Sequence, residues 1–439
     1  MVSQKQGVEM VRVFRNAVVV LSLAITVPAW SAAPVPRQSQ QPLVALRLDP
    51  RRIDRTLHAF VADGRAAGAS LLIWKGGREA YFGSAGFADR EAGRPIARNA
   101  LFQVFSMTKP VTGVGLMRLW EQGRFGLDDP LADYLPEFAA TKVFKGVDSA
   151  GRPILKTPGR PILIRDLLRH TAGFAYWPGA TYSEQQIAKI DPLNVGNTLA
   201  EFSSKLATIP LMFEPGTQWR YSAAVDVQAR LIEKLSGQPF ETYMREQVLA
   251  PLGMNDSAWT EPEESFGRLA TPYEVGPDAK LRPKSMEQKR QLNFSDRKLT
   301  MGGAGLASTA DDYMRFARML LGRGTLDGVR ILKPSTVRLM TTDQLDPKMT
   351  ERWWLPTKAN GGFGFDLFVR TGQPATKEEN RGATGEFFWD GAWSTLFWVD
   401  PVNDMAVVFL VQKDPYDFSL HHDIREAVYG KDYVGPAGD

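Results

Sequence analysis

A serine and a lysine three residues apart, Ser106 and Lys109, are the residues of this sequence whose types and spacing could do chemistry. On a helix this spacing places both side chains on one face, a turn apart, so the lysine amine can take the proton of the serine hydroxyl. At the start of a helix, unpaired N–H groups and the positive dipole end also favour the negative charge that develops during acyl transfer. The pair is therefore a candidate nucleophile with its base.

The same spacing recurs at Ser295 and Lys298, and chance alone gives about one such motif in a chain of this composition. The residues around Ser295 are polar and rich in Lys and Arg, with no apolar helical face, which predicts a solvated loop. Ser106 is instead followed by apolar residues at helical spacing: Val111, Val114, Met117 and Trp120. We therefore place the chemistry at Ser106.

The composition is that of a globular protein. The 439 residues, 44% hydrophobic, predict two lobes or one large composite domain. The 53 basic and 49 acidic residues give a formal net charge of +4 without a dense basic run, so we expect no nucleic-acid partner. The sequence has no cysteine, which excludes disulfides and thiol chemistry. Its four histidines show no metal-ligand spacing, and we expect neither a metal nor another cofactor.

The first 33 residues have the pattern of a secretory signal peptide. Basic residues precede an apolar run from Ala17 to Val27, and small residues follow it. The run is too short to span a bilayer comfortably. We expect cleavage after Ser31 or Ala33, a linker over residues 34–44, no stable membrane anchor, and a periplasmic or secreted mature protein. The alternative is an uncleaved anchor.

The predicted elements place strands at both ends of the chain and helices between them. A helix over residues 50–67 precedes strands at 70–74 and 79–87, which flank a Lys-Gly-Gly turn typical of a β-hairpin. Helices interrupted by Gly and Pro follow at 165–169, 184–189, 198–206 and 225–235. Residues 256–300 carry few large apolar side chains, which predicts a surface segment. The last third gives strands at 362–369, 385–390, 395–399 and 406–412, then a helix at 417–429.

This order of elements predicts an α/β (α+β) fold. An antiparallel sheet made from both chain ends, flanked by helices and interrupted by a mostly helical lobe, needs only short connections. We assign residues 45–105 and 300–439 to the sheet domain and residues 106–299 to the helical domain.

Two further segments could contribute side chains to the same site. Tyr221-Ser222-Ala223 ends an extended run that a Pro-Gly turn begins, and Trp389-Asp390-Gly391 ends a predicted strand. Together with Ser106-Met107-Thr108-Lys109, they resemble the serine β-lactamase and penicillin-binding-protein superfamily, in its class C-like branch. The Trp-x-Gly segment most resembles family VIII carboxylesterases. The resemblance extends over about residues 45 to 430 and implies a β-lactamase/transpeptidase-like fold.

The resemblance also implies a mechanism. Ser106 would attack an acyl carbon with help from Lys109 and Tyr221, forming an acyl-enzyme that water hydrolyses. Trp389 and Gly391 would line the substrate site, and the backbone N–H groups of Ser106 and Ala392 would form the oxyanion hole. A free lysine titrates near about 10.4, so burial or a nearby charge has to lower the pKa of Lys109 if it is the base. The sequence leaves open whether Lys109 or Tyr221 takes the proton.

Two positions depart from the lactam-cleaving members. Ala223 stands where β-lactamases have Asn, which removes an amide that would contact the acylamino group. Trp389 stands where they have Lys, or His in some peptidases, which removes a cation that attracts the substrate carboxylate. Asp390 is expected to point away from the face of Trp389, since side chains alternate along a strand. These departures favour a carboxylesterase acting on short-chain neutral esters.

Other hypotheses remain open. One is a β-lactamase, D-Ala carboxypeptidase or D-specific peptidase with the same Ser-Lys-Tyr site, acting on a lactam or peptide instead of an ester. Another is a non-catalytic ligand-binding protein with this fold. His170 could pair with a serine, but it lies between a leucine-rich helix and Thr171-Ala172-Gly173, which favours a capping or loop-fixing role. Because no Gly-x-Ser-x-Gly occurs, the α/β-hydrolase elbow is excluded. The oligomeric state is not indicated.

The first prediction separates the two Ser-x-x-Lys motifs. Ser106→Ala is expected to abolish ester hydrolysis and covalent labelling by a fluorophosphonate while the protein stays folded, because it removes the nucleophile. Ser295→Ala is the matched control and is expected to change little. Peptide mapping of the labelled protein is the measurement, and label on Ser295 or none on Ser106 would contradict the assignment.

Overall fold

The core of the molecule is an antiparallel sheet built from both ends of the chain. The computed structural model describes residues 46–376 and 378–435, and within them eight strands form one sheet in the order β12-β13-β14-β15-β16-β1-β2-β3. Their bounds are β1 Gly68–Lys75, β2 Arg78–Asp89, β3 Arg94–Pro95, β12 Gly361–Phe363, β13 Phe368–Arg370, β14 Phe387–Asp390, β15 Leu396–Asp400 and β16 Met405–Val411. The N-terminal strand β1 pairs with the C-terminal strand β16 from Ala69 opposite Val411 to Lys75 opposite Met405. The predicted sheet of both chain ends is confirmed.

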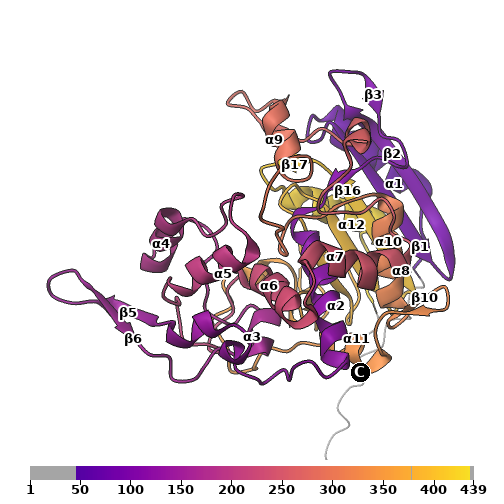
Figure 1. Cartoon of the computed structure of the whole chain (residues 1–439). Helices are drawn as coiled ribbons and strands as arrows, with labels where there is room; N and C mark the ends of the chain where they lie inside the picture. Colours follow the sequence, from indigo (N-terminus) through magenta and orange to yellow (C-terminus); the bar gives the residue numbers. More distant parts are fainter. Residues whose placement is uncertain (1–45, 377, 436–439) are drawn as a thin grey trace, which may run out of the picture. The chain divides into compact units, whose positions relative to one another are not determined.

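Helices cover both faces of this sheet (Figure 1). Helices α1 (Pro50–Ala62) and α12 (Phe418–Tyr429) pack together on one face, and α10 (Ala310–Leu321) packs on the other. Neighbouring residues of β15 point to opposite faces. Phe397 contacts Tyr313 of α10, with ring centroids 4.9 Å apart, and Trp398 stacks on Tyr429 of α12 at 6.4 Å. Because both faces are covered, β15 and β16 are continuously apolar instead of alternating.

The predicted helical insertion surrounds one buried helix, α2 (Thr108–Glu121), which packs against α6 (Ala224–Ser236). In Figure 1, α4, α5 and α6 lie on one side of α2 and the C-terminal strands lie on the other. The remaining helices are α3 Ile164–Leu168, α4 Tyr182–Ile190, α5 Leu199–Ala207, α7 Phe240–Met244, α8 Ala250–Leu252, α9 Met286–Gln291 and α11 Pro334–Met340. The described residues belong to one compact unit, so the boundary between a sheet domain and a helical domain stays a prediction.

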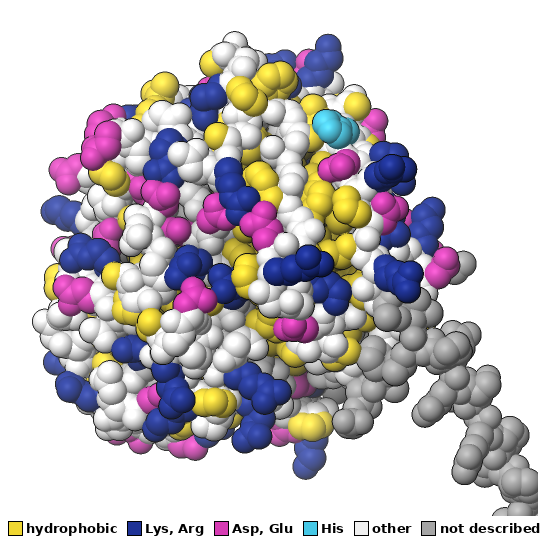
Figure 2. Space-filling model, turned by 90° about the vertical axis from the view of Figure 1, so that its right-hand side faces the viewer, with side chains coloured by type: hydrophobic (Ala, Val, Ile, Leu, Met, Phe, Trp, Pro, Cys, Tyr) yellow, Lys and Arg dark blue, Asp and Glu magenta, His cyan; other side chains and the backbone are white. Residues whose placement is uncertain are grey.

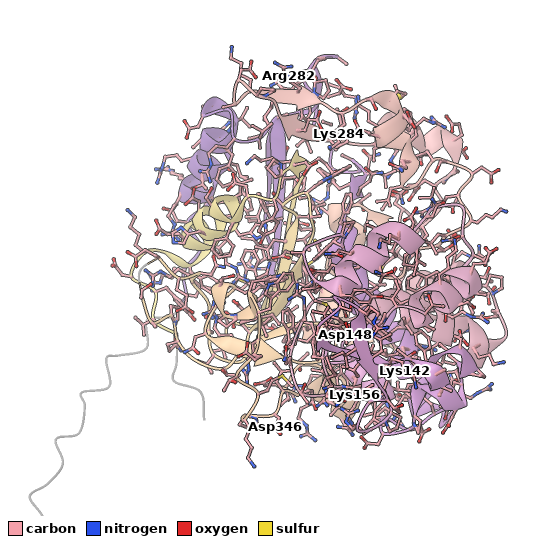
Figure 3. All side chains as sticks on the ribbon, turned by 90° about the vertical axis from the view of Figure 1, so that its left-hand side faces the viewer. Lys142, Asp148, Lys156, Arg282, Lys284 and Asp346 are labelled. Atoms are coloured by element: carbon pink, nitrogen blue, oxygen red, sulfur yellow. The ribbon has the colours of Figure 1, made fainter. Side chains whose placement is uncertain are left out.

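The shorter strands form small sheets around this core. They are β4 Phe102–Gln103, β5 Val143–Val147, β6 Pro153–Lys156, β7 Tyr273–Val275, β8 Leu281–Pro283, β9 Ala307–Ser308, β10 Thr325–Leu326, β11 Val329–Arg330 and β17 Lys413–Asp414. Lys142, Asp148 and Lys156 mark the projecting hairpin β5–β6 in Figure 3. Strands β4 and β9 pair with each other just before the Ser106 turn. This pairing brings the segment around Ala307 and Ser308 beside the turn.

Three local expectations were wrong. The predicted strand at 362–369 is a hairpin, β12 and β13, which turns at Asp366 with a φ of 58°. The first helix ends at Ala62 instead of residue 67, and Gly64 follows it with a φ of 68° that a helix cannot contain. Residues 256–300 are not merely a surface segment, because Trp259 and Tyr273 are buried and β7 pairs with β17.

The surface carries both signs of charge. Basic and acidic side chains are interspersed over the face shown in Figure 2, as expected from the near balance of 53 and 49 residues. Among the described residues, no helix has the length and apolarity needed to cross a membrane. The signal peptide and the linker predicted over residues 1–44 lie outside the described residues and stay predictions.

Candidate active site

Ser106 lies in a 3₁₀ turn, Phe105–Met107, that leads directly into α2. Phe105 has a φ of 45°, a left-handed conformation that bulky residues rarely adopt, and its ring packs against Trp393 with centroids 4.3 Å apart. On the other side of the turn, the Tyr313 hydroxyl donates to the carbonyl of Met107 at 2.7 Å. These contacts hold the turn so that the half-buried Ser106 lines a cavity.

Lys109 lies one turn further along, as its spacing from Ser106 predicts. Its Nζ is 3.2 Å from the Oγ of Ser106, donates to the carbonyl of Gly303 at 2.6 Å and lies 3.4 Å from the hydroxyl of Tyr176. The side chain is fully buried, and this burial lowers the pKa of Lys109 to about 8. Three carboxylates act in the opposite direction: Asp226, Asp366 and Asp390. At pH 7 roughly one tenth of the amine is then neutral and able to accept a proton.

A glycine-rich loop supplies the acceptor for this amine. The N–H of Gly303 donates to Oδ1 of Asp226 at 3.0 Å, and the hydroxyl of Thr112 donates to the carbonyl of Gly302 at 2.7 Å. A Cβ at position 303 would lie 3.2 Å from Nζ of Lys109 and 2.9 Å from Oδ2 of Asp226. The site therefore requires glycine at this position. This loop was not predicted to belong to the site, although its consecutive glycines could have indicated it.

Tyr221 lies beside both Ser106 and Lys109. Its hydroxyl interacts with the Ser106 hydroxyl and accepts a hydrogen bond from Nε1 of Trp389 at 3.3 Å. Nζ of Lys109 lies 4.6 Å from the centre of the Tyr221 ring. Burial raises the pKa of Tyr221 well above its usual range, although the hydrogen bonds from Ser106 and Trp389 oppose this. The structure thus brings together the three residues predicted from two separate motifs.

A cavity of about 700 Å³ opens beside Ser106, and Tyr221, Trp389, Gly391 and Ala392 line it. A Cβ at Gly391 would meet the carbonyl of Val104 at 2.4 Å, so only glycine lets strand β14 approach the nucleophile turn so closely. The N–H of Gly391 donates to Thr395, whereas that of Ala392 donates to no group of the described chain. The N–H of Ala392 is therefore available at the position predicted for the oxyanion hole.

Asp390 also lines this cavity, which corrects the expectation that strand alternation turns it away. Asp390 is the last residue of β14, and its carboxylate accepts hydrogen bonds from Lys358 and Tyr416, which line the same cavity. The cavity has further walls that sequence reasoning did not find: Trp177, Trp354, Thr357, Lys358, Asp414, Tyr416 and Phe418. They come from loops and from the ends of helices and strands, and no local pattern links them to Ser106.

His170 fixes the segment that carries Tyr221. It has a φ of 55°, its carbonyl accepts from the N–H of Arg220 at 3.1 Å, and its Nδ1 lies 3.1 Å from the hydroxyl of Ser222. It thus holds the residues on both sides of Tyr221, as its interpretation as a loop-fixing residue requires. The other Ser-x-x-Lys serine, Ser295, is exposed and donates to the carbonyl of Gln291.

A serine beside a buried amine and a tyrosine hydroxyl, next to a cavity, has the arrangement of a serine hydrolase site. Comparison with known proteins identifies the family of the chain. The chain belongs to the Beta-lactamase family, whose model matches residues 53–429. The resemblance found in its motifs is thereby confirmed, as is the β-lactamase/transpeptidase-like fold.

Several relatives match over most of their length. The chain is 36% identical to Protein Rv1367c of Mycobacterium tuberculosis, over 84% of this chain and 90% of that protein. It is 28% identical to Esterase EstB of Burkholderia gladioli, over 87% of this chain and 95% of the esterase. Among solved structures, it superposes with a TM-score of 0.71 on EstCE1, described as a hydrolase with promiscuous acyltransferase activity, at 26% identity over 87% of this chain and 98% of that one.

The pH profile tests the state of Lys109. If its neutral amine is the base, kcat/KM for a neutral ester should rise about tenfold per pH unit below the lowered pKa of about 8 and level off above it. The rise follows because burial disfavours the ammonium form, which cannot accept a proton. Hydrolysis is measured from pH 5.5 to 9.5, with circular dichroism as a control for unfolding. A profile that stays flat from pH 6 to 9 would rule out this role.

Gly303→Ala tests the contact that holds the amine. The added methyl group would lie 3.2 Å from Nζ of Lys109, and the resulting shift of the amine is expected to lower kcat by about a hundredfold. Gly267→Ala is the matched control, since a Cβ at that glycine meets open space. Thermal unfolding of both variants separates a catalytic effect from a loss of folding. Activity of Gly303→Ala within twofold of the unaltered protein would contradict the proposed geometry.

Proposed function

We propose that this chain is a carboxylesterase that hydrolyses short-chain, uncharged esters through an acyl-enzyme on Ser106. The observation that carries the proposal is the character of the cavity next to Ser106. Its walls are largely aromatic, formed by Trp177, Trp354, Trp389 and Phe418. Such walls suit the alkyl or aryl parts of an ester.

The charges of the cavity support an uncharged substrate. Among the lining residues of the described chain, Lys358 is the single cation, and it forms an ion pair with Asp390 and a hydrogen bond with Tyr416. The third charged lining residue, Asp414, pairs with Lys284 at 2.7 Å. The described lining residues therefore offer no unpaired cation to attract the carboxylate that lactam and D-Ala peptide substrates carry.

The residues at positions 389 and 223 support the same conclusion. Trp389 uses its N–H for Tyr221, so it offers a substrate an apolar ring and no charge. Ala223 is fully buried at the start of α6 and has no amide with which to bind an acylamino group. A β-lactamase or peptidase with the same Ser-Lys-Tyr site would use a cation at position 389 and an amide at position 223. This chain has neither.

The catalytic steps follow from the geometry. Oγ of Ser106 attacks the ester carbonyl carbon while its proton moves to the base, and the carbonyl oxygen becomes an oxyanion near the N–H groups of Ser106 and Ala392. The C–O bond to the alcohol then breaks, and the alcohol leaves with a proton supplied by the site. In the second half water attacks the acyl-enzyme: its hydroxyl joins the acyl group to form the acid, and its other proton restores the hydroxyl of Ser106.

The pKa shifts favour Lys109 as the base. Burial lowers the pKa of Lys109 and so favours its neutral, proton-accepting form. Burial raises the pKa of Tyr221 and so disfavours the phenolate that would be needed for Tyr221 to act as base. In this scheme Lys109 takes the proton of Ser106, while the neutral Tyr221 hydroxyl gives its own proton to the leaving alcohol and regains one from Lys109.

A matched pair of substrates tests the proposal. p-Nitrophenyl butyrate and p-nitrophenyl hemisuccinate share a leaving group and differ mainly in a carboxylate at the acyl end. We expect kcat/KM for the butyrate to be about tenfold to a hundredfold higher, because a charge-assisted hydrogen bond worth about 1.5–3 kcal/mol is absent. A cephalosporin and a D-Ala-D-Ala peptide complete the panel, and Ser106→Ala is the blank. Equal turnover of the cephalosporin and the butyrate would replace the esterase by the β-lactamase hypothesis.

A further inference from the structure

One end of the cavity is polar although the other walls are aromatic. Lys358 follows the 3₁₀ turn Leu355–Thr357, Asp390 ends β14, and Tyr416 precedes α12. Nζ of Lys358 donates to Oδ2 of Asp390 and, at 3.1 Å, to the hydroxyl of Tyr416, which donates to the same Oδ2 at 2.8 Å. The side chains of Lys358 and Asp390 are only 7% and 9% exposed, so they are held rigidly, and their remaining exposure faces the cavity they line.

The network is supported from behind by His421. Its Nδ1 lies 3.1 Å from the hydroxyl of Tyr416, and its Nε2 lies 2.8 Å from the carbonyl of Ser394. The ammonium of Lys358 also lies over three aromatic rings, with centroids 5.0 Å away for Trp354, 5.4 Å for Trp389 and 4.9 Å for Tyr416. These contacts fix the position of the charge pair and limit its freedom to reach solvent.

The pair keeps one donor and one acceptor unused. A lysine ammonium has three N–H donors, and those of Lys358 make two hydrogen bonds within the described chain. Both hydrogen bonds that Asp390 accepts from described residues reach Oδ2, so Oδ1 has none. A polar group on a bound substrate could satisfy the two together. Lys358 and Asp390 sum to zero charge, so this group need not be an ion.

We propose that Lys358 and Asp390 form a subsite for a hydroxyl group carried by the ester substrate, at a position remote from the scissile bond. A hydroxyl donates one hydrogen bond and accepts others, so it can donate to Oδ1 of Asp390 and accept from Lys358. A carboxylate can accept from Lys358 but is repelled by Asp390. An alkyl group leaves both polar atoms without partners once water is excluded, which disfavours its binding. The inference rests on the proposed esterase function and names its substrate class: hydroxylated, uncharged esters.

The experiment compares kcat/KM for matched esters that differ by one hydroxyl. The alcohol arm uses 2-hydroxyethyl and 4-hydroxybutyl butyrates against propyl and pentyl butyrates. The acyl arm uses methyl 3-hydroxybutyrate and methyl 6-hydroxyhexanoate against methyl butyrate and methyl hexanoate, with acid release followed by titration. We expect the unaltered enzyme to prefer the hydroxylated member at least tenfold in one arm.

Two variants show where the preference arises. Lys358→Met keeps most of the length of the side chain and removes its donors, and it is expected to reduce the ratio of hydroxylated to plain ester turnover about tenfold. Lys205→Met is the matched control, because Lys205 is half-buried and donates to Oδ1 of Asn197 at 2.7 Å but does not line the cavity. It is expected to keep the ratio. An unchanged ratio in Lys358→Met, or an equal loss in Lys205→Met, would overturn the assignment.

The unaltered enzyme tests the proposed hydroxyl subsite even if Lys358→Met does not fold. Hydrolysis of plain esters without a hydroxyl preference in either arm overturns the subsite and leaves the esterase proposal standing. Preference for the hemisuccinate over all hydroxylated esters also overturns it, since Lys358 would then bind a carboxylate. Failure to hydrolyse any ester would instead refute the proposed function on which the subsite rests.

Discussion

The burial of the Lys109 amine is the constraint on which the rest of the site depends. An ammonium group removed from water is costly, so the fold has to supply partners for it or favour its neutral form. Here the carbonyl of Gly303 accepts one hydrogen bond, and burial lowers the pKa of Lys109 to about 8. Complete burial also explains why α2 needs cover from several elements: α6, α7, the turn at Asp366 and the loop around Gly303.

The groups that act on Ser106 come from elements far apart in the sequence, and each is positioned by backbone contacts. Tyr221 is held by the contacts of His170 with the residues before and after it. Gly391 lets the end of β14 approach the nucleophile turn, which brings Trp389 to Tyr221 and the N–H of Ala392 to the cavity. The sheet made from both chain ends therefore serves the site directly, because its strand β14 carries one wall of the cavity.

The parts predicted correctly from the sequence are those encoded by local patterns. Ser106 and Lys109 share a helical face, and the Lys-Gly-Gly turn specifies the hairpin β1–β2. Tyr176, Gly303 and Lys358 were missed because their roles depend on which loops meet in space, and no periodicity records this. The strand predicted at 362–369 failed because Asp366 adopts a left-handed conformation that apolar flanking residues do not reveal.

The charge pair in the cavity also acts on the catalytic base. Asp390 is one of the carboxylates that raise the pKa of Lys109 against the larger effect of burial, and it raises the pKa of Tyr221 as well. The ammonium of Lys358, in contact with Asp390, offsets that negative charge at both groups. A substrate carboxylate at this end would act in the same direction as Asp390 and shift Lys109 towards the ammonium form, which cannot accept a proton. The proposed exclusion of anions from the cavity would therefore preserve the strength of Lys109 as a base as well as favour uncharged substrates.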